Sequence, residues 1–309
     1  MTFSALYGSG EWIRGAVGDE DVTIAGVTVK KQRIGLAHQV LGGGDGVISG
    51  LLGLAYPPLT QAYVGGNDTD RNPGSPNRDP YDPIFTSMRK QRLVAPQYFS
   101  MTMDRNHSGW LTFGDVPRVP HGRFSNAPIV KAEVYNISSP LMQTEYTFYT
   151  IVADDYVLGA RNASAITPEK TQWSQSRGAD PGYADHQFPA VVDSGSTLAV
   201  IPSAHAEAYA AQFAPPAVLN AFTGEYWAPC GAKVPRFGVV VGGQAFFLYE
   251  EDLLLQEEKL DWNGDGIMFC RLGVADGYGG PYILGDVFLN RVVSVFDVEI
   301  GEMHFAPRL

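Results

Sequence analysis

Glycine and proline interrupt this sequence at short intervals along its whole length, and their spacing constrains the fold more than any other feature. The 309 residues include 35 glycines and 21 prolines. Both residue types end helices and form turns, so long helices are disfavoured. The 16 phenylalanines and 15 tyrosines favour strands instead. The sequence therefore predicts an all-β fold built from many short strands.

Local patterns predict where several elements lie. Residues 22–29 alternate apolar and polar side chains around a glycine, which is typical of a hairpin. Residues 65–82 predict a long loop, and a short helix over 83–91 follows with Asp82 as its N-cap. Ser203 is expected to cap an alanine-rich helix that ends near residue 213. Further strands are expected over residues 98–103, 110–113, 145–159, 187–193, 292–297 and 303–306.

Charge limits the classes of partner. Lys and Arg number 22 against 33 Asp and Glu, which gives a formal net charge of −11. Nucleic acids and anionic membrane surfaces bind basic patches, so neither is an expected partner. No apolar run approaches the length of a membrane-spanning helix, about 18 residues. The start of the chain also lacks the basic region and apolar core of a signal peptide.

Two cysteines and four glycosylation sequences favour an oxidising compartment. Cys230 and Cys270 permit one disulfide, which would close a loop of roughly 40 residues and contribute about 4 kcal/mol in the chain-entropy model. Four Asn-x-Ser/Thr sequences can accept a glycan, and they begin at Asn67, Asn106, Asn136 and Asn162. Together these features favour a secreted chain, which conflicts with the missing signal peptide.

Searches for several other chemistries fail. The six histidines show no metal-ligand spacing, and the sequence contains no Gly-x-Ser-x-Gly elbow, P-loop or Gly-x-Gly-x-x-Gly motif. Residues 261–266 match the first half of a calcium-binding EF-hand loop, but Phe269 and Leu272 stand where later ligands are required. We interpret this segment as a polar turn, and we expect no metal or other cofactor.

One segment, residues 190–198, brings an acid to the end of an apolar strand. Two valines precede Asp193, and Gly195 lets the backbone approach another group closely. The hydroxyls of Ser196 and Thr197 can hydrogen-bond to an ionised Asp193. A bare Asp-Ser-Gly sequence is more often an ordinary turn at a strand end, so the surrounding sequence has to decide between the two interpretations.

The surrounding sequence resembles the pepsin-like aspartic peptidases. Residues 191–197 match that family's second active-site motif, and Ile283-Leu284-Gly285 matches the element that packs against it. The spacing of Cys230 and Cys270 is similar to that of a disulfide in the family's second lobe. Residues 7–10, Tyr-Gly-Ser-Gly, resemble the flap. Other matches, which extend the resemblance over nearly the whole chain, are Gln32 and residues 53–57, 99–100, 109–114, 296–297 and 303–306.

The resemblance implies a bilobal pepsin-like fold, with an incomplete first lobe over residues 1–120 and a complete second lobe over residues 121–309. It implies an acid endopeptidase in which two aspartates activate a water molecule, and Asp193 is one of the two. The residues implied to contact or cover a polypeptide substrate are Tyr7, Gly8, Ser9, Gly195, Ser196 and Thr197. A monomeric parent protein, secreted or delivered to a vacuole, is also implied.

The other aspartate of the pair is missing from this sequence. Asp-Ser/Thr-Gly occurs once, at Asp193. Leu51-Leu52-Gly53 resembles Ile283-Leu284-Gly285, and equal spacing in the two lobes would place the first motif about 40 residues before Met1. We therefore expect a chain that begins just before the flap and is inactive by itself. It would also expose an apolar surface where the opening strands of the first lobe would pack.

Three interpretations remain open. The first is an aspartic endopeptidase represented by an incomplete sequence, and the intact motif around Asp193 favours it. The second is a catalytically inactive relative that binds peptides, which the missing aspartate favours. The third is a homodimer that pairs two copies of Asp193, although the remaining part of the first lobe stands in the way.

Overall fold

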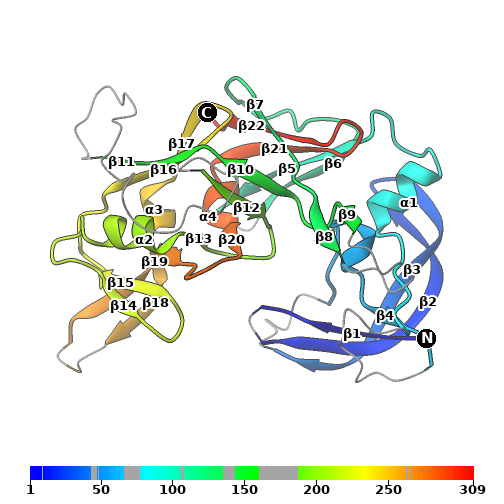
Figure 1. Ribbon diagram of the computed structural model, residues 1–309, viewed down its shortest axis with the longest axis horizontal. Coiled ribbons are helices and arrows are strands. Elements are labelled where there is room, and N and C mark those ends of the chain that lie inside the picture. The colour runs from blue at the N-terminus through cyan, green and yellow to red at the C-terminus, as the bar shows by residue number, and fades with distance from the viewer. Residues whose placement is uncertain are drawn as a thin grey trace. The chain divides into compact units, whose positions relative to one another are not determined.

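The structure, a computed structural model, describes residues 1–8, 10–42, 47, 49–65, 77–105, 108–134, 143–159, 187–261, 264 and 266–309. The chain divides into two units, each made of two segments (Figure 1). The first unit is Met1–Gln97 with Lys131–Phe148, and the second is Tyr98–Val130 with Tyr149–Leu309. Short strands predominate in both units, so the all-β prediction from glycine, proline and aromatic residues is confirmed.

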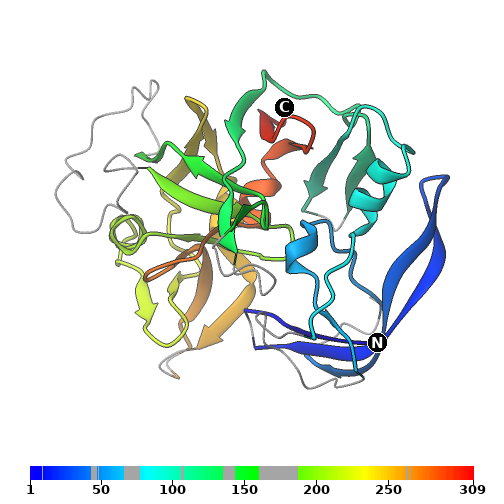
Figure 2. The same ribbon diagram turned by 45° about the vertical axis from the view of Figure 1, so that its right-hand side comes forward.

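The first unit is built on an antiparallel sheet. Its strands are β1 (Thr2–Leu6), β2 (Trp12–Ile24), β3 (Val27–Leu41) and β4 (Ala62–Tyr63), in the order β3-β2-β1-β4. The other elements are the 3-10 helix η1 (Pro57–Leu59), helix α1 (Ile84–Lys90) and the strand pair β8 (Ala132–Val134) and β9 (Gln143–Glu145). Figures 1 and 2 show β2 and β3 (blue) as one long hairpin, and β3 is an edge of this sheet among the described residues.

The two residues of the turn explain why the chain reverses direction between β2 and β3. Ala25 and Gly26 connect the strands with φ of 50° and 79°. A two-residue type I′ turn requires positive φ at both of its central residues, and its twist matches that of the strands. Ile24 pairs with Val27, so the hairpin predicted over residues 22–29 is confirmed.

The described residues of the second unit form three sheets and three helices. The largest sheet follows the order β10-β12-β20-β13-β19-β15-β14, and β18 also pairs with β19. The other two sheets have the orders β11-β16-β17 and β6-β5-β21-β22-β7. The element bounds, in chain order, are β5 (Tyr98–Asp104), β6 (Ser108–Phe113), β7 (Ser125–Pro128), β10 (Thr150–Ala153), β11 (Asp155–Gly159), β12 (Phe188–Val192), β13 (Ala199–Ile201), α2 (Ser203–Ala210), β14 (Val218–Asn220), β15 (Glu225–Pro229), β16 (Arg236–Val241), β17 (Gln244–Phe247), α3 (Glu250–Leu253), β18 (Leu254–Asp261), β19 (Met268–Asp276), β20 (Tyr282–Leu284), α4 (Asp286–Leu289), β21 (Val292–Asp297) and β22 (Glu302–Pro307).

Buried aromatic rings hold α4 in place within this unit. Phe288 of α4 meets Phe305 of β22 and Phe246 of β17 edge-on, with ring centroids 5.6 and 6.0 Å apart. All three side chains are fully buried. Each such ring removes a large apolar area from water, which is the main stabilising contribution to the core. The first turn of α4, which carries Asp286, is thereby fixed against two sheets.

Both predicted helices form, but neither begins with the predicted cap. The residue at the N-cap of α1 is Pro83, and the Asp82 carboxylate instead accepts hydrogen bonds from Lys90 at 2.6 and 2.8 Å. Helix α2 ends at Ala210, before the predicted residue 213, and the Ser203 hydroxyl donates to Asp276 at 2.6 Å. Asp82 is therefore paired with the last residue of α1, and Ser203 is bonded to Asp276 of β19, instead of capping the first turns of their helices.

Candidate active site

Asp193 lies where β12 ends, and its carboxylate is bonded within its own loop. The Gly195 N–H donates to Oδ1 at 2.9 Å, and the Ser196 hydroxyl donates to Oδ2 at 2.7 Å. The Asp193 side chain is half-buried, whereas Gly195 is exposed. Two donors aimed at separate oxygens fix the orientation of the carboxylate. The loop therefore presents one oriented carboxylate that remains accessible to solvent.

Strand β20 holds this loop from behind. It pairs parallel with β12 and antiparallel with β13, the two strands that flank the Asp193 loop. The Asp193 N–H donates to the Leu284 carbonyl at 3.1 Å, and the Gly285 N–H donates to the Leu198 carbonyl at 3.2 Å. A Cβ atom at Gly285 would lie 2.2 Å from the Ser196 carbonyl oxygen. Only glycine fits there, so residues 283–285 pack against the motif as the sequence predicts.

Helix α4 adds a second carboxyl group beside the first, which the sequence analysis missed. The Asp286 N–H donates to the Ser196 carbonyl at 2.8 Å, while the Val287 N–H donates to the Thr197 carbonyl at 3.1 Å. Burial, Asp193 and Asp252 raise the pKa of Asp286 to about 6, in order of decreasing effect. In the sequence, Asp286 is recognisable only as an acid directly after Gly285. That position does not reveal that the backbone of residues 286 and 287 contacts the Asp193 loop.

The predicted flap residues lie in the other unit, where β1 turns into β2. The Tyr7 N–H donates to the Glu11 carbonyl at 2.9 Å, and the Gly10 N–H donates back to the Tyr7 carbonyl at 3.0 Å. Burial and, to a smaller degree, the Glu11 carboxylate raise the pKa of Tyr7, although its side chain is 41% exposed. Gly8 has open space around its Cα, and Ser9 lies outside the described residues.

The similar tripeptides at residues 51–53 and 283–285 lie in opposite environments, one exposed and one buried. Leu284 is fully buried between strands, whereas Leu51 and Leu52 are 70% and 48% exposed and lie outside any strand. A Cβ at Gly285 would collide with backbone, but a Cβ at Gly53 would meet nothing within 4 Å. The first unit therefore exposes the apolar residues whose counterpart in the second unit supports the Asp193 loop.

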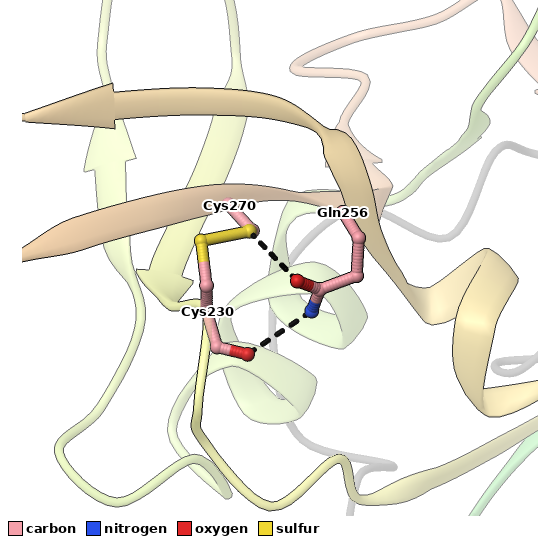
Figure 3. Close-up of a disulfide and its surroundings, with 3 residues drawn as sticks. All are labelled: Cys230, Gln256 and Cys270. Atoms are coloured by element: carbon pink, nitrogen blue, oxygen red, sulfur yellow. Dashed lines mark hydrogen bonds between the residues drawn. A yellow bond between two sulfur atoms is a disulfide. The ribbon is translucent and has the colours of Figure 1, made fainter.

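The predicted disulfide is present. Cys230 and Cys270 are bonded with Cα atoms 4.9 Å apart, and they join the end of β15 to β19. Figure 3 shows Gln256 beside this bond: its Nε2 donates to the Cys230 carbonyl at 3.0 Å, and its Oε1 lies 3.6 Å from Cys270 Sγ. The pairing that the spacing permits, and that the resemblance implies, is confirmed.

Other sequence signals have mixed outcomes. The Asp261 carboxylate accepts hydrogen bonds from the Gly264 and Gly266 N–H groups at 2.8 and 3.2 Å, as in a polar turn. Among the described residues, no three His, Cys, Asp or Glu side chains gather in a way that could hold a metal ion. None of the helices in the described part of the chain is long and apolar enough to span a membrane. The sequons at Asn67, Asn106, Asn136 and Asn162 lie outside the described residues.

Comparisons with known proteins agree with this architecture. The family model described as eukaryotic aspartyl protease matches residues 1–158 and 162–308. A crystal structure of an aspartic proteinase from Irpex lacteus superposes with a TM-score of 0.67, covering 99% of this chain and 81% of that chain at 21% identity. The fold is therefore that of the pepsin-like aspartic proteinases. The chain belongs to the eukaryotic aspartyl protease family.

Curated relatives support the same family. A probable aspartic-type endopeptidase of Aspergillus fumigatus is 36% identical over 97% of this chain and 62% of its own length. Aspergillopepsin-1 of Emericella nidulans is 28% identical over 98% of this chain and 63% of its length. Cathepsin D of Clupea harengus is 27% identical over 98% of this chain and 65% of its length. The chain thus spans less than two thirds of each of these relatives.

Proposed function

We propose that Asp193 is one of two catalytic carboxylates of an endopeptidase that hydrolyses extended polypeptides at acidic pH. The observation that carries this proposal is the orientation of the Asp193 carboxylate by the Gly195 N–H and the Ser196 hydroxyl, at 2.9 and 2.7 Å, on a loop supported by β20. The membership of the chain in the eukaryotic aspartyl protease family supports the reaction class.

Two carboxyl groups that share one proton divide the acid and base roles between them. The ionised group removes a proton from a water molecule as the water attacks the peptide carbonyl carbon. The protonated group donates to the carbonyl oxygen, on which negative charge develops. In this scheme we assign the base role to Asp193, whose carboxylate is oriented by two hydrogen-bond donors. A second carboxylate is needed for the acid role.

The partner carboxylate belongs, in this proposal, to a part of the relatives that this chain does not span. Asp-Ser/Thr-Gly occurs only at Asp193, and the chain covers 62% of its Aspergillus fumigatus relative. The exposure of Leu51 and Leu52 also supports a first lobe that needs further strands to bury them. The chain alone is then inactive, because one carboxylate cannot act as acid and base together.

The substrate-contacting residues follow from the same proposal. Gly195, Ser196 and Thr197 offer backbone groups to an extended peptide beside Asp193, while Tyr7, Gly8 and Ser9 cover it as a flap that limits access of water. The exposure of Gly195 and Thr197 and the half-exposed ring of Tyr7 are compatible with these roles. The disulfide supports an oxidising destination, outside the cell or in a vacuole. The proposal also includes glycans on the sequons and a monomeric whole protein.

A second candidate function is peptide binding without cleavage. The presence of a single Asp-Ser/Thr-Gly sequence favours it, because such a chain keeps a peptide-contacting loop but not the pair of carboxylates. The two candidates differ in what the whole natural protein contains. They also differ in whether that protein turns over the peptides that it binds.

Two measurements test the proposal. The mass of the natural protein, corrected for glycans, should exceed that of Met1–Leu309 and include a further Asp-Ser/Thr-Gly peptide. The whole protein should cleave an unfolded polypeptide at about pH 3–5. Asp193→Ala should abolish this cleavage, and Met1–Leu309 alone should not cleave the polypeptide. A natural mass equal to that of Met1–Leu309, with labelled peptides bound but intact, would establish the second candidate. Cleavage by Met1–Leu309 that Asp193→Ala abolishes would refute the requirement for a second carboxylate.

A further inference from the structure

The Cys230–Cys270 disulfide lies among three neighbouring strands of the largest sheet. Strand β19 pairs with β15 and with β18. Cys270 belongs to β19, and Cys230 directly follows the last residue of β15. The sequence contains no other cysteine, so this bond is the only disulfide that Met1–Leu309 can form within itself.

Strand β18 bulges where it passes the disulfide. Leu255 pairs with Arg271, but the next pair along the ladder joins Lys259 to Cys270. Residues 256–258 therefore have no ladder partner on β19. A β-bulge leaves its extra residues unpaired and disrupts the ladder locally. Opening of β18 at this point breaks few backbone hydrogen bonds, so it is a site of local opening.

One side chain of this bulge lies on the disulfide itself. Gln256 Nε2 donates to the Cys230 carbonyl at 3.0 Å, and Gln256 Oε1 lies 3.6 Å from Cys270 Sγ (Figure 3). Cys270 is fully buried, Cys230 is half-buried and Gln256 is exposed. The Gln256 amide therefore stands between solvent and the buried sulfur on the side where it contacts the bond.

A second side chain of the bulge holds the opposite face of β19. Cys270 and Arg271 are consecutive in a strand, so their side chains point to opposite faces of the sheet. Arg271 forms ion pairs with Glu258 of the bulge and, at 2.7 Å, with Glu225 of β15. The bulge is thus held on both faces of β19, while Glu257, between the two contact residues, is exposed.

We propose that residues 256–258 form a gate on the disulfide, which has to open before a thiol can reach the sulfur atoms. A thiolate reduces a disulfide only by direct contact with one of its sulfurs, so access controls the rate. Opening the gate breaks the contacts of Gln256 and Glu258 but leaves the pairing of β15 with β19 in place. The closed gate lets the folded chain keep its disulfide in the presence of thiols. This gate lies within the second unit and does not depend on the proposed role of Asp193.

Reduction by dithiothreitol, a small dithiol, gives the gate a measurable rate. One thiolate of the reagent bonds to a cysteine sulfur, the S–S bond breaks, and its electron pair leaves with the other cysteine sulfur. The second thiolate of the reagent then displaces the first cysteine as a thiolate and closes a cyclic disulfide. The protein disulfide gains the two electrons that the reagent loses. Iodoacetamide alkylates the freed cysteines, and mass spectrometry measures the alkylated fraction.

The test compares the reduction rates of the wild type and three variants of the full chain without denaturant. Gln256→Ala should be reduced roughly tenfold faster, because the hydrogen bond to Cys230 is lost. Glu258→Gln should be reduced roughly threefold faster, because loss of its ion pair with Arg271 loosens the same bulge. Glu257→Gln is the matched control, since it removes the same charge from the same bulge, and its rate should equal that of the wild type.

Urea distinguishes opening of the gate from unfolding of the whole chain. Local opening exposes little surface, so the reduction rate should hardly change with urea below the unfolding transition, whereas reduction through global unfolding accelerates steeply. A steep acceleration of the wild type, an unchanged rate in Gln256→Ala, or an equal rise in Glu257→Gln would overturn the proposal. If amide spectra show that Gln256→Ala does not fold, Gln256→Asn, whose shorter side chain cannot keep both contacts, replaces it. These rates require no peptide cleavage, so an inactive chain with gated reduction would refute only the proposed function.

Discussion

Gly285 is the residue on which the Asp193 loop depends most directly. A Cβ there would lie 2.2 Å from the Ser196 carbonyl oxygen and 2.6 Å from the Leu198 carbonyl oxygen, and both neighbours are backbone atoms that cannot swing aside. Gly285→Ala should therefore lower the free energy of unfolding by about 3 kcal/mol or more. Urea denaturation followed by tryptophan fluorescence would measure the change.

Gly53→Ala is the matched control for this substitution. Gly53 ends the similar tripeptide of the first unit, where a Cβ would meet nothing within 4 Å. The free energy of unfolding should change by no more than about 0.5 kcal/mol. Equal effects of the two substitutions would contradict the difference in packing between the two units.

Asp286 should make stability depend on pH. Its pKa is raised to about 6 in the folded chain, chiefly by burial, so the folded state keeps a proton that the unfolded state has already lost. The stability of the wild type should therefore fall as pH rises from about 4 to about 6, and no further contribution should be lost above that range. In Asp286→Asn the fall should be smaller, as judged by urea midpoints between these pH values. An identical pH dependence in both proteins would contradict the raised pKa.

At the scale of single elements, the β2–β3 turn offers a stabilising substitution. Ala25 has φ of 50°, a left-handed conformation that costs energy for alanine and that asparagine tolerates better. Ala25→Asn creates the Asn-Gly sequence preferred in type I′ turns and should stabilise the chain by about 0.5–1 kcal/mol. The β-branched Ala25→Val should destabilise it. Thermal unfolding of both variants measures the effect, and a stabilising valine would refute the turn assignment.

Elements were predictable where local rules alone decide them. Alternation around Ala25-Gly26 and the apolar strand that ends at Asp193 are local patterns, and both elements form as expected. The helix caps failed because Asp82 and Ser203 found charged or buried partners that no local rule reveals. The electrostatic role of Asp286 was missed for the same reason, since Asp193 and Asp252 come from distant parts of the sequence.

At the scale of the whole molecule, a long exposed apolar stretch lies in the first unit. Residues 34–41 of β3 are all exposed, although they include Ile34, Leu36, Val40 and Leu41. This stretch contains no Lys, Arg, Asp, Glu or Pro, the usual protections of an edge strand against pairing with another chain. The sequence predicts an exposed apolar surface where further strands of this lobe would pack, whereas the apolar exposure on β3 was found only in the structure.

Met1–Leu309 should therefore self-associate in a concentration-dependent way. Leu36 and Val40 are 72% and 62% exposed, and Leu36→Lys with Val40→Lys would place two like charges on the edge strand. Sedimentation velocity should show a clear shift of the double variant toward monomer, because association would then bring these charges together. Ile300→Lys is the control, since Ile300 is 61% exposed in a turn of the second unit. A wild type that stays monomeric at high concentration, or an equal effect of Ile300→Lys, would show that β3 is not the surface of association.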